Sequence, residues 1–264
     1  LEKYNELHRE SFELRQLVTF RNAKTKPIHS WYPYTQGFDE DLVFYLAEAL
    51  ELKPGSIVLD PFGGVGTTGI ACRKLGFKSI LSDVSPLVNW VSQVKNSEID
   101  VERITLALDS GELSRSIQHP RKIQLNQSLF SSFFDSAYEP EVLDKVLRIL
   151  AFLEDSDFDV ATVDFLRLML VGKLESMSNI RKHGSHYRYL NSTTSIGLAK
   201  LNIPLFEAKG DVYSVFEGAI LRGLEDLKAT SFALPASSSK SLLRSAKSLG
   251  IRAKSVDAII TSPP

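Results

Sequence analysis

Apolar residues recur at helical spacing near the start of the chain and form a short continuous run soon after. Residues 3–19 carry a rough apolar face of this kind, which predicts a helix. Asp39 or Asp41 can cap a second helix over residues 40–50. The apolar run Ile57–Leu59 then predicts a short buried strand.

Strand and helix signals continue to alternate up to about residue 96. A helix after a glycine-rich turn is expected to end at Leu75, with Gly76 as its C-cap. A second strand is expected over Ser79–Asp83, and Pro86 suits the first position of the next helix. Because strands joined by helices pair in parallel, the pattern predicts an α/β fold with a parallel, doubly wound sheet.

The pattern becomes mostly helical from about residue 97 to residue 229. Val160–Met177 is apolar nearly all round, which predicts a central buried helix. Loops are expected near residues 119–138 and 179–210. We expect this region to be a large helical insertion between the second and third strands of the sheet.

Strand character returns at Ser231–Leu234. A helix near residues 240–249 and a last buried strand over Val256–Ile260 are expected to follow. We expect residues 1–96 to form the first half of the sheet with the segment before it, residues 97–229 the helical insertion, and residues 230–264 the later strands.

Composition narrows the class of protein. The 264 residues can bury one large core with a sizeable insertion. No apolar run reaches membrane-span length, and the N-terminus lacks a signal-peptide pattern, so we expect an intracellular, cytoplasmic protein without a membrane partner. Cys72 is the only cysteine, which excludes an internal disulfide and a cysteine zinc cluster. The net charge of −1 means that a nucleic-acid partner would need a local basic patch.

The first strand runs into a glycine-rich turn, Asp60-Pro-Phe-Gly-Gly-Val-Gly-Thr-Thr68. The turn fits G-x-G-x-x-G, and with Asp83 at the end of the second strand it also suits an NAD-binding domain. Asp60 argues against NAD, because a carboxylate at the strand tip would repel a pyrophosphate. S-adenosyl-L-methionine has no phosphate and carries positive charge, so the acid favours this cofactor.

The glycine turn and the terminal segment Val256-Asp-Ala-Ile-Ile-Thr-Ser-Pro-Pro264, in this order, resemble the cofactor loop and catalytic loop of the amino-group DNA methyltransferases. Members of that family methylate cytosine N4 or adenine N6. The resemblance implies a Rossmann-like methyltransferase sheet and double-stranded DNA as the partner. Trp31–Phe38 also looks like the family segment that closes over the cofactor. The cofactor-binding residues expected on these grounds are Thr35, Phe38, Asp60, Pro61, Phe62, Gly63, Gly64, Gly66, Thr67, Thr68 and Asp83.

The terminal loop suits chemistry on a base amine. Pro263 and Pro264 stiffen the loop and have no N–H, so it presents acceptors. Acceptors on Ser262 and the Pro263 carbonyl could bind the two amine hydrogens and turn the nitrogen lone pair towards the methyl donor. The base must leave the helix to reach such a loop. We therefore expect Ser262, Pro263 and Pro264 to be catalytic, and by the family pattern Thr261-Ser262 favours cytosine N4.

The chain departs from the family pattern in three ways. No aromatic residue follows Pro264, the strands that complete the sheet are absent, and Pro235–Lys240 lacks the acid often found near the adenine ring. The sheet is therefore expected to be incomplete at its C-terminal side, and the chain to be a fragment or to depend on a partner chain. Two alternatives stay open: an RNA guanine N2 methyltransferase with the same cofactor, and a partial or non-catalytic subunit.

Residues 179–190 interleave basic and aromatic side chains. They could neutralise phosphates and stack on bases, although a solvated basic loop is the alternative. His183 and His186 are spaced like metal ligands, but without a cysteine or nearby carboxylate we predict no metal site. Nucleic-acid contacts are expected from Arg181, Lys182, Tyr187, Arg188 and Tyr189.

Overall fold

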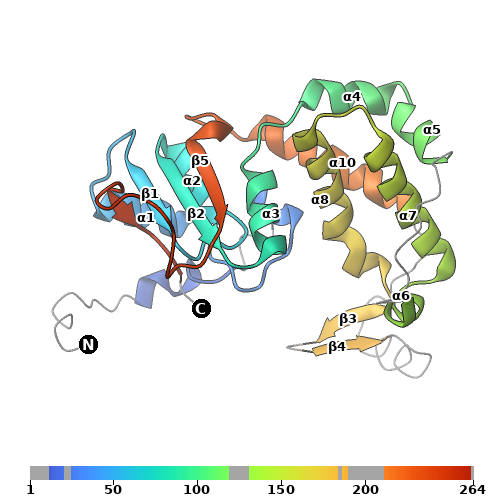
Figure 1. Cartoon of the computed structure of the whole chain (residues 1–264), viewed down its shortest axis with the longest axis horizontal. Coiled ribbons are helices and arrows are strands. Elements are labelled where there is room, and N and C mark those ends of the chain that lie inside the picture. Colours follow the sequence, from blue (N-terminus) through green and yellow to red (C-terminus); the bar gives the residue numbers. More distant parts are fainter. Residues whose placement is uncertain (1–11, 21–24, 119–130, 184–185, 190–210, 263–264) are drawn as a thin grey trace. The chain divides into compact units, whose positions relative to one another are not determined.

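The computed structural model describes residues 12–20, 25–118, 131–183, 186–189 and 211–262 (Figure 1). The chain divides into two compact units. Unit 1 consists of Leu1–Glu98 and Ala229–Pro264, and it contains a parallel sheet. Unit 2, Ile99–Lys228, is mostly helical in its described part.

The sheet of unit 1 has four strands in the order β5-β2-β1-β6. Every neighbouring pair is parallel, with Leu59 paired to Ile80 on one side and to Ile259 on the other. The carboxyl ends of the strands therefore share one edge. This arrangement confirms the predicted α/β fold with a parallel sheet. The strands are β1 (Ile57–Asp60), β2 (Lys78–Asp83), β5 (Ser239–Leu243) and β6 (Ala258–Ile259).

Local signals fixed the helix ends near the sheet. The Asp39 carboxylate accepts a hydrogen bond from the Asp41 N–H at the start of α1. Ser85 caps α3, whose first residue is Pro86, and Gly76 ends α2 in the left-handed conformation. These predicted ends are confirmed. The helical segments of unit 1 are η2 (Phe12–Gln16), η4 (His29–Trp31), α1 (Glu40–Ala49), α2 (Thr67–Leu75), α3 (Pro86–Lys95) and η5 (Ala236–Ser238).

The helix predicted over residues 3–19 is found only in part. Residues 3–11 lie outside the described residues, and the rest forms the short 3-10 helix η2 and a turn. The segment is anchored on α1, because the Asp39 N–H donates to the Leu17 carbonyl at 2.8 Å. Leu14 and Leu17 also pack on the hydrophobic core of unit 1.

Unit 2 is built around α8 (Val160–Met177). Phe165, Leu166 and Leu168 are fully buried, and a Cβ placed on Gly223 of α10 would lie 2.7 Å from the Phe165 ring. The prediction of a central buried helix is confirmed. The other helices are α4 (Val101–Asp109), α5 (Glu112–Gln118), α6 (Ser131–Ala137), α7 (Pro140–Asp155) and α10 (Val212–Ala229).

The two loops predicted in unit 2 were partly wrong. Helix α6 lies in the first of them, and β3 (Ile180–His183) and β4 (His186–Tyr189) form an antiparallel hairpin in the second. Basic and aromatic residues alternate along β4, and this spacing suits a strand as well as a loop. No helix in the described ranges is long and apolar enough to cross a membrane.

The prediction for residues 231–249 was wrong. Ser231–Leu234 is not a strand, and Ser239–Leu243 forms β5 where a helix was expected. Serine has weak strand preference, so the local signal was poor. Contacts from distant segments decide the outcome: Ser79 donates to the Ser239 hydroxyl at 2.8 Å, and Ser92 and Ser241 share a hydrogen bond of 2.9 Å.

Candidate active site

The glycine turn and the terminal loop lie side by side at the carboxyl edge of the sheet. The Ile260 N–H donates to the Leu59 carbonyl at 3.0 Å, which extends the parallel pairing of β1 and β6. The next residues on the two strands are Asp60 and Thr261, and the Thr261 hydroxyl donates to Asp60 Oδ1 at 2.7 Å. Segments about 200 residues apart in sequence are thereby joined at one point.

The buried Asp60 carboxylate links three segments of the chain by hydrogen bonds. It also accepts hydrogen bonds from the Thr68 hydroxyl at 2.5 Å and from the Phe62 N–H at 3.1 Å. Burial raises the pKa of Asp60, these hydrogen bonds oppose the rise, and the charge of Asp83 adds to it. The carboxylate thus holds the turn, α2 and the terminal loop together. A direct contact between Asp60 and a cofactor stays a prediction.

The glycines of the turn are required by its own packing. The Gly63 N–H donates to the Ser82 carbonyl at 2.8 Å, and a Cβ at Gly63 would lie 2.9 Å from Leu81 Cβ. Gly66 has a φ of +87°, and its Cβ would lie 2.6 Å from Asn96 Nδ2. The backbone therefore fits tightly against β2 and α3.

Helix α2 begins directly after this turn without a side-chain cap. Gly66 is its N-cap and can offer no side-chain acceptor to the first N–H groups of the helix. Thr67 and Thr68 begin the helix, and both side chains are buried. An uncapped helix N-terminus attracts anions such as a carboxylate.

Asp83 ends β2 at the same edge and is half-buried. One of its oxygens accepts from the Gly64 N–H at 3.2 Å and the other from the Ser85 N–H at 2.8 Å. A carboxylate oxygen can accept a second hydrogen bond, so Asp83 can still bind two hydroxyl groups. Its predicted role with a ribose is compatible with this geometry and stays a prediction.

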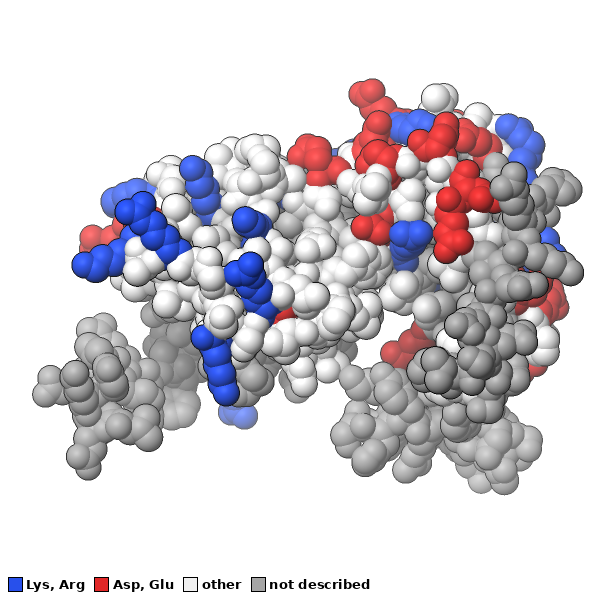
Figure 2. Space-filling model, in the orientation of Figure 1, with Lys and Arg blue, Asp and Glu red and all other residues white. Residues whose placement is uncertain are grey.

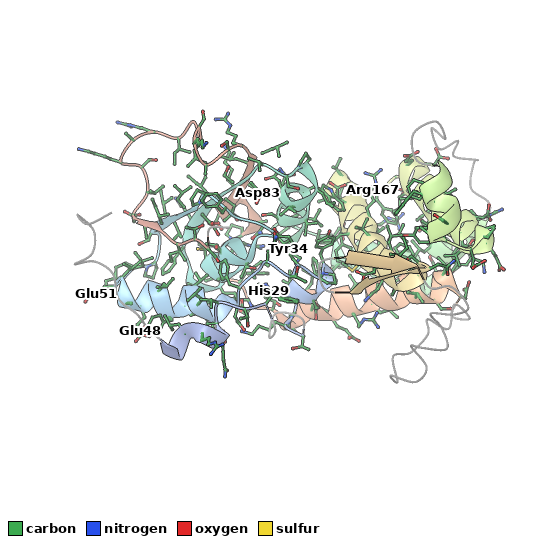
Figure 3. The ribbon with its side chains drawn as sticks, turned by 90° about the horizontal axis from the view of Figure 1, so that it is seen from below. His29, Tyr34, Glu48, Glu51, Asp83 and Arg167 are labelled. Carbon is green, nitrogen blue, oxygen red and sulfur yellow. The ribbon has the colours of Figure 1, made fainter. Side chains whose placement is uncertain are left out.

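Tyr34 is a residue of this edge that the sequence argument missed. A Cβ placed on Gly64 would lie 3.5 Å from its ring, and its hydroxyl donates to Gln36 Oε1 at 3.0 Å. Burial raises the pKa of Tyr34, and the negative charge of Asp83 raises it further. Figure 3 labels both residues in the same part of unit 1. The aromatic run around residues 31–34 was the signal that could have identified it.

The other predicted residues are distributed unevenly. Phe62 is 39% exposed beside the turn, Thr35 is exposed, and Phe38 is buried in the core with Val43 and Val58. Their contacts with a cofactor stay predictions. Ser262 follows Thr261 and is half-buried, whereas Pro263 and Pro264 lie outside the described residues.

The basic and aromatic residues predicted to bind nucleic acid lie on the β3–β4 hairpin of unit 2. Arg181 pairs with Arg188 and Lys182 with Tyr187 across the two strands, and Tyr189 pairs with Ile180. Their binding role stays a prediction. The described residues contain no group of His, Cys, Asp and Glu side chains that could hold a metal ion.

A buried charged cluster at the start of α1 was also missed. Glu40 accepts hydrogen bonds from Lys74 at 2.8 and 3.0 Å, and His29 Nε2 at 3.1 Å and Lys26 Nζ at 3.9 Å lie near the same carboxylate. His29 and Lys74 outweigh burial and lower the pKa of Glu40 to about 2. Burial lowers the pKa of His29, although the hydrogen bond and charge of Glu40 oppose this shift.

Lys95 is fully buried near this cluster. Its ammonium group donates to the His29 carbonyl at 3.0 Å, and burial lowers its pKa to about 7. No ion pair with Lys95 is found among the described residues. Single polar residues in α1, α2 and α3 form no local motif, so the sequence alone does not indicate that they lie close together.

Comparisons with known proteins agree on one family. Residues 21–87 match the model of the N6/N4 DNA methylase family. The chain is 29% identical to the type II methyltransferase M.BsoBI of Geobacillus stearothermophilus, over 95% of this chain and 52% of that protein. It is 30% identical to M.AvaI of a Nostoc species, over 66% of this chain and 36% of the relative. M.MjaII of Methanocaldococcus jannaschii is 35% identical over 31% of this chain and 15% of the relative.

No solved structure gives a significant match to the chain. The chain spans about half the length of M.BsoBI and about a third of M.AvaI. The family match covers the glycine turn and Asp83, and it favours a methyltransferase over an NAD-binding domain. By these matches, the chain is related to the N6/N4 amino-group DNA methylases.

Proposed function

We propose that this chain binds S-adenosyl-L-methionine at the carboxyl edge of its sheet and belongs to a DNA methyltransferase. We further propose transfer to an exocyclic amino group, cytosine N4 rather than adenine N6. The observation that carries the proposal is the 2.7 Å hydrogen bond from Thr261 to Asp60, because it holds the terminal loop beside the glycine turn. The DNA methylase family model supports DNA as the substrate. The Thr261-Ser262-Pro263-Pro264 motif supports cytosine by resemblance.

The edge offers groups that complement the proposed cofactor. Asp83 can accept from the ribose hydroxyls, and the uncapped N-terminus of α2 can bind the carboxylate. The ring of Tyr34 forms an adjacent wall over Gly64. When bound, the cofactor supplies an electrophilic methyl group on a sulfonium. The residues present therefore fit S-adenosyl-L-methionine.

The terminal loop acts on the amine. The lone pair of a base amine is delocalised into the ring, which makes the nitrogen a poor nucleophile. Acceptors on Ser262 and the Pro263 carbonyl bind its two hydrogens and favour a tetrahedral nitrogen, while the tie between Thr261 and Asp60 fixes the position of the loop. The same acceptors would hold the excess proton of the methylated nitrogen in position for release to water.

No cysteine nucleophile is available for a covalent route. Cys72 lies in the hydrophobic core of unit 1, and burial raises the pKa of its thiol to about 12. A thiol of this kind stays protonated at neutral pH and is a poor nucleophile. Direct transfer to a base that has left the helix is the mechanism we propose.

The test is a titration of the chain with S-adenosyl-L-methionine and with NAD. Wild type should bind the first, and Asp83→Asn should weaken binding at least about tenfold, because two charge-assisted hydrogen bonds are lost. Asp109→Asn, an exposed acid of α4, is the matched control and should bind normally. Binding of NAD but not of S-adenosyl-L-methionine would refute the proposal.

Product analysis then distinguishes the substrates. Methylation of duplex DNA should yield N4-methylcytosine, and N6-methyladenine would correct the choice of base. Methylation of transfer RNA but not of duplex DNA would favour the RNA guanine alternative. Because the chain spans about half of M.BsoBI, cofactor binding without transfer would favour the partial subunit.

A further inference from the structure

The net positive charge of unit 1 comes from a short stretch near the end of the sequence. Residues 229–264 contain five Lys and Arg and one acid, Asp257. Unit 1 as a whole has 16 Lys and Arg against 13 Asp and Glu, whereas unit 2 has 15 against 19. The five basic residues lie between residues 240 and 254, which we call the basic connection. They are Lys240, Arg244, Lys247, Arg252 and Lys254.

The basic connection lies on the face of the sheet opposite α1 (Figures 1 and 3). Along β5, Ser239 and Ser241 contact Ser79 and the α3 residue Ser92 on one face. Because successive strand residues point to opposite faces, the exposed Lys240 between them points to the other face. The segment after β5 then returns across the sheet to β6.

The connection begins at the candidate active site. The Arg244 N–H donates to the Asp83 carbonyl at 3.0 Å, and its carbonyl accepts from the Ser82 hydroxyl at 2.8 Å. Its guanidinium donates to the Leu249 carbonyl at 2.9 Å, which holds the side chain against the loop without neutralising it. The backbone of Arg244 is therefore fixed next to Asp83, the acid predicted to bind the cofactor.

The five charges are available to a partner. All five side chains are exposed, and within the part of the chain that the structure describes none of them forms an ion pair. Figure 2 shows Lys and Arg predominating over Asp and Glu on the visible face of unit 1. Exposed hydroxyls at Ser245 and Ser248 lie between the charges. Clustered basic side chains with interspersed hydroxyls match the chemistry of a phosphate backbone.

We propose that the basic connection binds the phosphate backbone of duplex DNA across the face of the sheet opposite α1, with Arg244 at the carboxyl edge. The proposal rests on the proposed function, because it names the surface by which that site holds its substrate. It differs from the expectation for the β3–β4 hairpin, which belongs to the unit with excess negative charge. The connection supplies position and charge, while base recognition is left to other segments.

The test measures the affinity of the whole chain for a labelled duplex as a function of salt. Three charges are removed together in Lys247→Gln/Arg252→Gln/Lys254→Gln, which keeps most of each side-chain stem. The matched control, Lys53→Gln/Lys78→Gln/Lys228→Gln, removes three exposed positive charges outside the connection. Unfolding curves of both variants check that the fold is kept.

We expect the connection variant to bind duplex DNA at least about tenfold more weakly. The slope of log affinity against log salt should fall in magnitude by about 2 to 3, since each phosphate contact contributes about 0.9. The control should keep the wild-type slope. Equal losses in both variants, or no loss in the connection variant, would overturn the proposal. A loss confined to RNA would overturn the choice of duplex DNA.

Failure of the proposed function is measured separately. Titration with S-adenosyl-L-methionine involves neither DNA nor the three substituted residues, so both variants should bind the cofactor like wild type. A chain that binds DNA through the connection but does not bind the cofactor would refute the methyltransferase and keep the surface. A chain that binds the cofactor but not duplex DNA would refute the surface.

Discussion

The buried Lys95 should make unit 1 more stable at high pH than at neutral pH. Its ammonium group has the His29 carbonyl as its hydrogen-bond acceptor, and burial lowers its pKa from 10.5 to about 7. One pKa unit corresponds to about 1.36 kcal/mol, so the penalty for burying the charged form is roughly 4 to 5 kcal/mol.

The sign follows from proton binding. Below pH 7 the folded and unfolded states both carry the proton, so the penalty is constant and complete. Between pH 7 and pH 10.5 the unfolded state binds more protons than the folded state, and the free energy of unfolding therefore rises with pH. Near pH 10.5 the penalty has almost disappeared.

The substitution Lys95→Met keeps the length of the stem and removes the charge. It also leaves the His29 carbonyl without its donor, which costs about 1 to 3 kcal/mol. At pH 6 to 7 the variant should therefore be more stable than wild type by roughly 2 kcal/mol. The gain should shrink as the pH rises and change sign near pH 9, where the remaining penalty equals the cost of the lost hydrogen bond.

Urea denaturation between pH 6 and pH 10, followed by tryptophan fluorescence, measures this difference. Both tryptophans, Trp31 and Trp90, belong to unit 1, so the signal reports on that unit. Lys78→Met at the exposed start of β2 controls for the general effect of losing a positive charge. Parallel stability curves for wild type and Lys95→Met would refute the reasoning.

Three further predictions concern the glycine turn, the Glu40 cluster and the terminal loop. Gly66→Ala should destabilise unit 1 by about 1 to 3 kcal/mol more than Gly55→Ala in urea denaturation. Both glycines have positive φ, but only a Cβ at residue 66 would meet neighbours, 2.6 Å from Asn96 Nδ2. Equal losses of stability in the two variants would contradict this. Because its pKa is lowered to about 2, Glu40 should contribute roughly 3 kcal/mol to the free energy of unfolding above pH 4.5, and this contribution is lost as the pH falls towards 2. Glu40→Gln should therefore make stability depend less on pH between 4.5 and 2. An unchanged pH dependence in this range would exclude the role. Thr261→Val should lower the methylation rate at least about tenfold by releasing Asp60, whereas Thr261→Ser should restore it; equal rates in the two variants would show that the hydroxyl is dispensable.

Elements with local signals were predictable from the sequence. Gly76 and Pro86 fixed the end of α2 and the start of α3, because capping depends on neighbouring residues alone. Strand β5 was missed because its serines gain their stability from Ser79 and Ser92, more than 140 residues away in sequence. Its pairing with β2 is therefore a property of the assembled sheet.

The candidate site shows the same division. The turn and Asp83 follow from a motif, whereas the tie between Asp60 and Thr261 depends on the pairing of β1 with β6. The burial of Lys95 depends on how α3 packs on the segment around His29. The five basic residues of the basic connection can be read from the sequence. They were not singled out, because the net charge of −1 describes the whole chain and not its parts.

Unit 2 is inserted into unit 1 after α3, at a position where the sheet does not depend on it for its strand pairing. The connection that leaves β2 already contains α3, and this helix contacts β5 directly. The Glu98 carboxylate at the entry accepts from the Ala236 N–H, 3.4 Å away and just after the exit. Because Glu98 and Ala236 connect the two segments of unit 1 that flank the insertion, we expect that the inserted segment can change in length or sequence while the sheet keeps its register. The length of unit 2 is therefore expected to vary without a change in the residues at the carboxyl edge.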